Sequence, residues 1–206
     1  MMTGVILAGG TMRRLRGIEA GLLPYAESTI MQRQLQVMES CCSEIILITD
    51  DPRRYLEHVP RRVRVLADYY EGRGPLGGLH AGVALAQNDA VWVTGSAMPC
   101  VSPAAALRLL ERMLQDGSLA CLPDGEHGAF PLHGVFSTRC LAPLEGLLQG
   151  GTVEPDWTAL LDLLPVSRYS EAELAAEGIE PGYGLRIRHA EDYWRALAQD
   201  AASRED

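Results

Sequence analysis

Short, continuous apolar runs alternate along the chain with stretches whose apolar residues recur every three or four positions. The runs lie at residues 5–8, 45–48, 63–66, 91–93, 119–122 and 130–136, with a shorter one at 186–188. Runs of this length, bounded by turn residues, predict strands that are buried on both faces.

Helical spacing follows several of these runs. Ser28 or Thr29 is placed to cap a helix that ends near residue 40, and Pro103 opens another one behind Ser102. The apolar stripes predicted to face inward are Met31, Leu35 and Met38; Leu79, Val83 and Ala86; Leu107, Leu110 and Leu114; and Trp157, Leu160, Leu161 and Leu164. Further helices are predicted over residues 141–148 and 190–197, and Trp157 and Trp194 are predicted to be core residues.

The alternation of strands and helices predicts an α/β fold. We expect a single Rossmann-like domain of three layers, in which helices cover both faces of a mostly parallel sheet. The domain is predicted to span residues 1–199, and residues 200–206 to form a polar, frayed tail.

Polar and glycine residues follow four of the predicted strands. They are Gly9-Gly10, Asp50, Asp68 and Gly95-Ser96. Ligands of such sheets bind beyond the carboxyl ends of the strands, so we expect these residues to meet in one crevice. A glycine pair lets backbone N–H groups approach an anion, and Arg13 and Arg14 add charge for phosphate oxygens. The alternative interpretation of the glycine pair is a tight surface turn.

Composition narrows the possible ligands. The 206 residues carry a net charge of −9, which argues against a general nucleic-acid-binding surface. All 18 basic residues are arginine. The five cysteines form no Cys-x-x-Cys pair, so we expect a reducing, cytoplasmic environment and no zinc site. We identify neither a signal peptide nor an apolar stretch near the ~20 residues of a membrane span.

Several motifs, taken in their order and spacing, resemble the MobA-like nucleotidyltransferases, which include the molybdenum cofactor guanylyltransferases. They are Leu7-Ala8-Gly9-Gly10 with Arg14, Leu22-Leu23-Pro24, Thr49-Asp50-Asp51-Pro52, Gly74-Pro75-Leu76-Gly77-Gly78-Leu79, Val93-Thr94-Gly95-Ser96-Ala97-Met98-Pro99, Pro131-Leu132-His133-Gly134-Val135-Phe136 and Glu191-Asp192-Tyr193. The likeness extends over most of the chain.

The resemblance implies a fold like that of the nucleotide-diphospho-sugar transferases. It implies transfer of a guanylyl group from GTP to molybdopterin-bound molybdenum, with release of pyrophosphate and with Mg²⁺ as the cofactor. On this basis Arg14 is the predicted catalytic residue. The predicted nucleotide-binding residues are Leu7, Ala8, Gly9, Gly10, Asp50, Asp68, Gly77 and Gly78.

The chain departs from the family pattern at charged and polar positions. Ala20 stands where the family has a lysine, and Ala97 stands where it has an aspartate. Met12 and Arg16 replace a hydroxyl residue and a glycine, and Arg188-His189-Ala190 replaces Asn-Thr-Pro. Since Mg²⁺ prefers hard oxygen ligands, a methyl group at position 97 makes magnesium binding doubtful, and we assign no metal ligand.

Other residues are candidates to replace the lost groups. Glu19, Asp50 and Asp68 offer carboxylates, and Arg13, Arg14 or Arg16 offer a cation of different shape and reach from lysine. His133 lies in the segment that resembles the pterin side, and Cys100 follows the fourth strand. We interpret both as structural residues.

Three functions therefore stay open. The first is a molybdenum cofactor guanylyltransferase with rearranged active-site ligands, whose activity is impaired or lost. The second is a nucleotide- or pterin-binding pseudoenzyme that acts as a partner or chaperone for a molybdoenzyme or for an active paralogue. The third is a purely structural protein with an empty crevice, against which the two glycine motifs argue, because packing alone is not expected to need both.

Overall fold

Parallel strands with buried side chains form the centre of the fold. The computed structural model describes residues 1–9, 14–15, 17–125, 128–150 and 155–202. Within these residues the main sheet has the spatial order β10 (Gly128–Ala129), β9 (Ala120–Gly125), β11 (Val135–Ser137), β8 (Ala90–Gly95), β1 (Met2–Leu7), β6 (Cys42–Ile48) and β7 (Arg64–Leu66), and β12 (Val166–Ser170) also pairs with β9.

The strand directions confirm the predicted fold class. Strand β1 pairs in parallel with both β6 and β8, and β6 pairs in parallel with β7. Strand β11 runs antiparallel between β8 and β9, while β12 returns parallel to β9. The chain is thus one α/β domain with a mixed, mostly parallel sheet.

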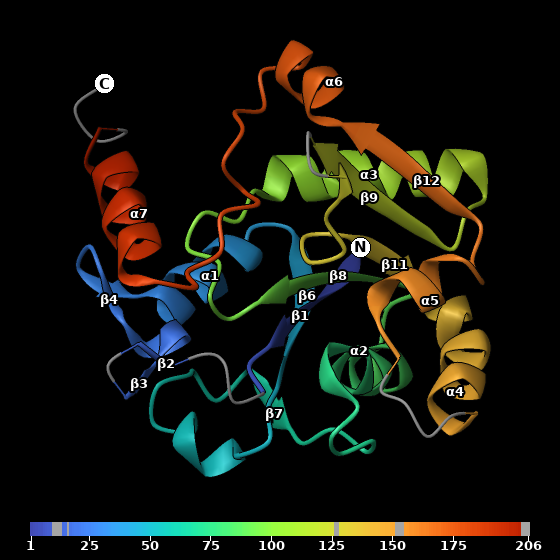
Figure 1. The fold of residues 1–206 in the computed structure, drawn as a ribbon, viewed down its shortest axis with the longest axis horizontal. Coiled ribbons are helices and arrows are strands. Elements are labelled where there is room, and N and C mark those ends of the chain that lie inside the picture. The colour runs from blue at the N-terminus through green and yellow to red at the C-terminus, as the bar shows by residue number, and fades with distance from the viewer. Residues whose placement is uncertain (10–13, 16, 126–127, 151–154, 203–206) are drawn as a thin grey trace.

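Helices cover both faces of this sheet (Figure 1). They are α1 (Ile30–Met38), α2 (Gly74–Leu85), α3 (Pro103–Asp116), α4 (Leu141–Gln149), α5 (Trp157–Leu161), α6 (Glu171–Ala176) and α7 (Ala190–Ala202), with short 3₁₀ turns η1 (Ala20–Leu22), η2 (Pro52–Arg54) and η3 (Thr138–Cys140). Helices α1 and α3 lie on one face and α2 and α4 on the other, and α7 lies beside β4. Two small hairpins, β2 (Arg14–Leu15) with β3 (Ile18–Glu19) and β4 (Pro24–Tyr25) with β5 (Ser28–Thr29), precede α1.

Local sequence signals set the helix starts as predicted. Thr29 caps α1 through a capping box with Gln32, and the Ser102 hydroxyl accepts a hydrogen bond from the Ala105 N–H at the start of α3. The predicted inward stripe of α1 is also confirmed, because Met31, Leu35 and Met38 are all buried.

The predicted inward stripe of α3 is wrong. Leu107 and Leu114 are 48% and 69% exposed, and the buried positions are Ala105, Ala106, Leu109 and Met113. The helix carries two apolar stripes. The stripe with alanines packs on the sheet, because small side chains let the helix axis come close to the strands.

The second glycine motif belongs to a helix and not to a loop. Helix α2 begins at Gly74, so Gly77 and Gly78 lie in its first turns. A Cβ atom on Gly78 would lie 3.0 Å from Leu7 Cδ2, and one on Gly82 would lie 2.8 Å from Val5 Cγ1. Glycine at these two positions therefore allows close packing of α2 on β1, so packing accounts for part of the second motif, and the first motif is the one that packing leaves unexplained.

Other differences concern the last part of the chain. Residues 186–188 form no strand, and β12 was not predicted because its alternation is broken by Arg168. Of the run 130–136, only Val135 and Phe136 belong to a strand. Trp157 packs against the core as predicted, whereas Trp194 is 64% exposed. Helix α7 continues past the predicted end at Leu197, to Ala202.

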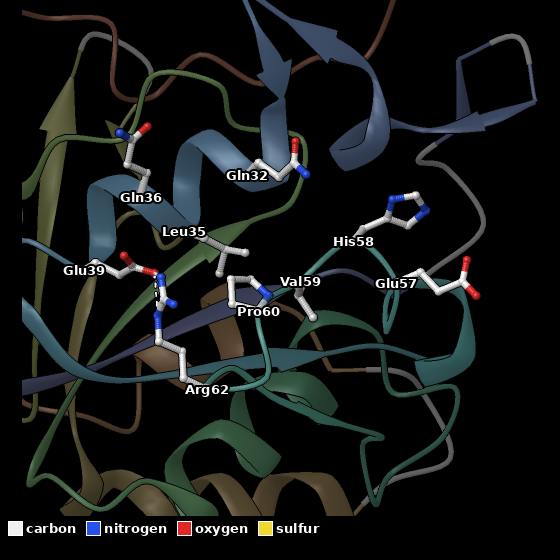
Figure 2. A pocket seen from close by; sticks show the side chains of 9 residues that line it. All are labelled: Gln32, Leu35, Gln36, Glu39, Glu57, His58, Val59, Pro60 and Arg62. Atoms are coloured by element: carbon white, nitrogen blue, oxygen red, sulfur yellow. Dashed lines mark hydrogen bonds and ion pairs between the residues drawn. The ribbon is translucent and has the colours of Figure 1, made fainter.

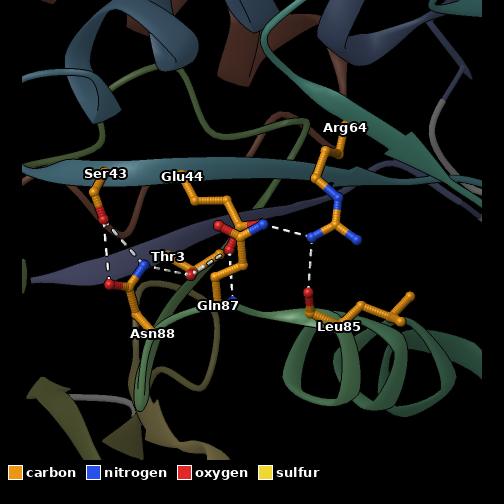
Figure 3. Close-up of polar contacts among 7 residues, drawn as sticks. All are labelled: Thr3, Ser43, Glu44, Arg64, Leu85, Gln87 and Asn88. Carbon is orange, nitrogen blue, oxygen red and sulfur yellow. Dashed lines mark hydrogen bonds and ion pairs between the residues drawn. The ribbon is translucent and has the colours of Figure 1, made fainter.

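A polar network fastens the amino ends of the strands to the end of α2 (Figure 3). The Glu44 carboxylate accepts hydrogen bonds from the Thr3 hydroxyl and the Gln87 N–H, both at 2.8 Å. It also forms an ion pair with Arg64 Nη1 at 2.6 Å. Arg64 Nη1 also donates to the Leu85 carbonyl at 2.8 Å. One side chain of β6 thereby ties together β1, β7 and the C-terminus of α2.

Candidate functional site

The carboxyl ends of β1, β6 and β8 lie side by side, as the sequence predicted. Leu7 is in register with both Ile48 and Gly95. Backbone hydrogen bonds extend the pairing beyond the strands, from the Ala8 N–H to the Ile48 carbonyl at 2.7 Å and from the Ser96 N–H to the Leu7 carbonyl at 2.9 Å. The turns that leave these strands therefore begin from one rigid edge.

Gly9 and Asp50 are neighbours at this edge. A Cβ atom on Gly9 would lie 3.6 Å from the Asp50 backbone nitrogen. The carbonyl of the preceding residue, Ala8, accepts hydrogen bonds at 3.4 Å from the Thr49 and Tyr55 hydroxyls. These contacts fix the backbone that leads into Gly9 and leave the Asp50 side chain exposed.

Asp68 lies at the same edge, beyond the end of β7. The side chain is half-buried, and its pKa is raised by burial first and then by repulsion from Glu71 and Asp50. Asp50 and Asp68 therefore bring two acidic side chains to the same edge of the sheet.

Gly77 and Gly78 lie in the first turns of helix α2. The Gly77 N–H donates to the Arg73 carbonyl at 3.4 Å, and a Cβ atom on Gly77 would lie 2.7 Å from the Tyr70 carbonyl oxygen. Because both residues lack a side chain, neighbouring protein atoms occupy the space that a side chain would take: the Tyr70 carbonyl at Gly77 and the Leu7 side chain at Gly78. Their predicted contact with a nucleotide stays a prediction.

Part of the first motif falls outside the described residues. This applies to Gly10, Met12, Arg13 and Arg16. The backbone of Arg14 lies in β2, where Arg14 pairs with Glu19 of β3 in the hairpin. The predicted catalytic role of Arg14 stays a prediction.

Ala20 and Ala97, the two positions where the expected charges are missing, belong to one apolar cluster. Ala20 is 3% exposed and Ala97 is 8% exposed. The other buried members are Leu23, Tyr25, Ile30, Ile187 and Ala196, and Leu185, Tyr193 and Leu197 pack against them. We call these ten residues the apolar corner. Four segments that are distant in the sequence build it, including the C-terminal helix α7.

Hydrogen bonds and close contacts hold the turn that carries Ala97. The buried Gln34 amide donates to the Gly95 carbonyl at 2.8 Å and to the Met98 carbonyl at 2.6 Å. The Ile187 N–H donates to the Ala97 carbonyl at 2.9 Å. We did not identify Gln34 or Ile187 from the sequence, since their contacts span 61 to 90 positions and no local pattern marks them.

Glu19, the acidic residue next to Ala20, is engaged in an ion pair. Its carboxylate contacts Arg54 Nη1 at 2.6 Å, and Arg54 also pairs with Asp51 at 3.2 Å. Glu19 is 7% exposed, so its charge is neutralised by Arg54 within a largely dry environment. Arg54 thereby joins the β2–β3 hairpin to the turn after β6.

The apolar corner does not fit a magnesium ion. Mg²⁺ takes hard oxygen ligands, including one or two carboxylates, whereas positions 20 and 97 offer methyl groups. The Ala97 carbonyl already accepts the Ile187 N–H. Within the described part of the chain, no three His, Cys, Asp or Glu side chains are grouped so that they could hold a metal ion.

His133 and Cys100 have structural surroundings, in keeping with our interpretation. His133 is fully buried, its Nε2 accepts the Ser102 N–H at 2.9 Å, and burial lowers its pKa to about 4. Burial raises the pKa of the Cys100 thiol, whose sulfur lies 3.6 Å from the Tyr25 hydroxyl oxygen. Tyr25 in turn donates to the Ala196 carbonyl at 3.3 Å.

A shallow groove of about 340 Å³ lies elsewhere, between α1 and the segment that leads to β7 (Figure 2). Its lining residues are Gln32, Leu35, Gln36, Glu39, Glu57, His58, Val59, Pro60 and Arg62. The lining includes none of the predicted site residues, and a Glu39–Arg62 ion pair closes one end. We assign it no role.

A family profile described as MobA-like NTP transferase domain matches residues 4–162. The chain belongs to this family. Among curated relatives, it is 31% identical over 157 residues to a probable molybdenum cofactor guanylyltransferase of Methanosarcina mazei, covering 72% of this chain and 69% of that protein. It is 33% identical over 152 residues to a molybdenum cofactor guanylyltransferase of Vibrio atlanticus, covering 71% and 74%.

Solved structures of other proteins have the same fold as this chain. Molybdopterin-guanine dinucleotide biosynthesis protein A from Archaeoglobus fulgidus superposes with a TM-score of 0.82 at 21% identity, covering 98% of this chain and 100% of that one. The 2-C-methyl-D-erythritol 4-phosphate cytidylyltransferase of Thermus thermophilus superposes with a TM-score of 0.67 at 18% identity, covering 97% and 98%. Among the described residues, no helix combines the length and the apolar character needed to cross a membrane.

Proposed function

We propose that this chain is a guanylyltransferase-like protein that binds GTP at the carboxyl edge of its sheet and transfers the guanylyl group to molybdopterin-bound molybdenum slowly or not at all. Family membership and the names of the relatives support the substrate class. The observation that carries the proposed impairment is the burial of Ala20 and Ala97 in the apolar corner.

The family residues that this chain keeps at the carboxyl edge of the sheet are suited to bind GTP. The backbone at Gly9 is unobstructed by a side chain and is fixed by the Ala8 contacts, so it suits a phosphate group. Asp50 and Asp68 offer carboxylate acceptors, which suit N–H or hydroxyl groups of a nucleoside. These residues recognise and orient a ligand without supplying positive charge.

Transfer at phosphorus needs more than orientation. Negative charge spreads over the phosphoryl oxygens in the transition state, and catalysis depends on cations placed there. Removing one such stabilising group typically slows a reaction by about 10²–10³-fold. With methyl groups at both positions 20 and 97, we expect transfer to be slower than in a lysine- and aspartate-containing relative by at least that factor.

The second candidate is a pseudoenzyme that binds a nucleotide or pterin and assists a molybdoenzyme or an active paralogue. The apolar corner favours this candidate over a rearranged active site, because α7 packs onto the corner through Ala196 and closes it. The two candidates share the binding step and differ in whether any transfer occurs.

Calorimetric titration with GTP, with and without Mg²⁺, tests the proposal. We expect GTP to bind with an affinity that Mg²⁺ leaves unchanged. Tightening by Mg²⁺ would overturn the loss of the metal site, and absence of binding would favour a structural protein with an empty crevice. Asp68→Asn should weaken binding, whereas Asp89→Asn, the same change at an exposed position before β8, should not.

An activity assay separates the two candidates. The purified protein is incubated with GTP, Mg²⁺ and molybdopterin-bound molybdenum, and pyrophosphate release is measured beside a relative that has the lysine and the aspartate. Slow release above background identifies an impaired transferase. Bound GTP without release identifies the pseudoenzyme, and release at the relative's rate overturns the impairment.

A further inference from the structure

Sulfur atoms gather at the amino end of β6, away from the predicted nucleotide edge. Cys41 ends the turn after α1, and Cys42 is the first residue of β6. The strand has seven residues, so at about 3.3 Å per residue its two ends are roughly 20 Å apart. Whatever these sulfur atoms bind is therefore separate from the nucleotide.

The two thiols face one another. Cys41 Sγ and Cys42 Sγ lie 3.8 Å apart, and both side chains are half-buried. The Cys41 thiol also donates to the Met38 carbonyl, with 3.8 Å between the sulfur and the oxygen. Two cysteine sulfur atoms at this distance can bind one metal ion between them once they are thiolates.

A thioether lies beside this pair. Met38 Sδ and Cys42 Sγ are 2.9 Å and 3.2 Å from the position that a Cβ atom on Gly4 would take. Met38 is the last residue of α1 and is fully buried. Glycine at position 4 therefore leaves the space that both sulfur atoms occupy.

We propose that Cys41, Cys42 and Met38 form a binding site for a soft monovalent metal ion of the Cu(I) class. Thiolate and thioether ligands together select Cu(I) over harder ions. With metal–sulfur bonds of about 2.3 Å, the 3.8 Å separation of the two Sγ atoms corresponds to an S–metal–S angle of about 110°. This angle suits a three-coordinate ion, and the Met38 sulfur, which lies with Cys42 Sγ beside Gly4, is the third ligand that we propose.

Binding at this site involves no redox step. The copper arrives as Cu(I), two Cu–S bonds form, and the two thiol protons pass to solvent. The thioether contributes a lone pair and loses no proton. The affinity should consequently rise with pH until both thiols are deprotonated.

Anaerobic competition with the coloured Cu(I)–bicinchoninate complex tests the site in the full chain. We expect the wild-type protein to remove one equivalent of Cu(I) and to show a sulfur-to-copper charge-transfer band. Cys41→Ser and Cys42→Ser should each lose that equivalent. Cys100→Ser is the matched control, because Cys100 is also half-buried but contacts the Tyr25 hydroxyl, and it should retain the copper.

One further variant and a check of folding keep the test decisive. Met38→Leu keeps the volume nearly constant and removes the sulfur, so it should weaken Cu(I) binding by at least the roughly 10–100-fold that loss of an outer-shell partner costs. If Cys42→Ser fails to fold by circular dichroism, Cys41→Ser decides alone. A wild-type protein that leaves copper with bicinchoninate, or cysteine variants that still bind one equivalent, would overturn the site, and unchanged affinity in Met38→Leu would overturn the three-sulfur assignment.

Discussion

Replacing Gly82 by alanine should force helix α2 away from strand β1. The added Cβ would lie 2.8 Å from Val5 Cγ1 and 3.0 Å from Val5 Cγ2. Val5 is fully buried, and because it carries two methyl groups, each staggered rotamer leaves a methyl in at least one of these two positions. The helix must shift as a whole, and with it the first turns that carry Gly77 and Gly78.

Gly146 offers the matched comparison. It is exposed within α4, and nothing lies within 4 Å of the Cβ position. Glycine to alanine in a helix interior gains about 0.8–1 kcal/mol of helix propensity at either site. At Gly82, overpacking of the core opposes this gain by about 1–3 kcal/mol. The difference in unfolding free energy between the two variants therefore isolates the packing contribution.

Urea denaturation followed by circular dichroism measures this difference. We expect Gly146→Ala to be more stable than the wild-type protein and Gly82→Ala to be about 1–3 kcal/mol less stable than Gly146→Ala. For a domain of this size, that corresponds to a melting temperature roughly 2–12 °C lower. The double variant Val5→Ala with Gly82→Ala should show a favourable coupling energy, since the smaller side chain admits the methyl group. Equal stability of Gly82→Ala and Gly146→Ala would refute the explanation that Gly82 is needed for close packing of α2 on β1.

Three further predictions follow from the buried polar and apolar groups. Glu44→Gln should lower the unfolding free energy by about 1.5–3 kcal/mol at pH 7, because it removes the charge that Arg64 faces. Burial alone would raise the pKa of Glu44, but hydrogen bonds from Gln87, Thr3 and Arg64 lower it, so the stability advantage of the wild-type protein should disappear as the pH falls through this depressed pKa. An advantage that persisted in acid would contradict the assignment. His133 is neutral in the fold with a pKa of about 4 because it is buried, against about 6.5 in the unfolded chain, so stability should be full above pH 6.5 and decline by about 3 kcal/mol as the pH falls to 4. His133→Asn should flatten this decline in pH-dependent melts, the exposed His58→Asn should not, and an unchanged slope would show that the decline has another source. Ala97→Asp should destabilise the protein by about 3–5 kcal/mol relative to the similarly sized, uncharged Ala97→Asn, because the carboxylate enters the apolar corner without a partner. Equal stability of the two variants would mean that this corner tolerates charge.

The sequence determined the fold class and most of the central elements. Apolar runs located β1, β6 and β8, because strands buried on both faces need continuous apolar residues. Capping residues located the starts of α1 and α3. The motifs identified the family, since they preserve an order and spacing along the chain that a family profile also detects.

The tertiary structure decided what those elements face. The leucines at helical spacing in α3 predicted the wrong inward stripe, and the fold instead packs the stripe with the alanines on the sheet. The sequence showed that Ala20 and Ala97 lack the family's charges, but only the fold showed that they share one closed apolar corner with Ile187 and Ala196. Periodicity is a property of neighbouring residues, whereas this corner depends on contacts between segments more than 70 positions apart, which form only when the whole chain packs.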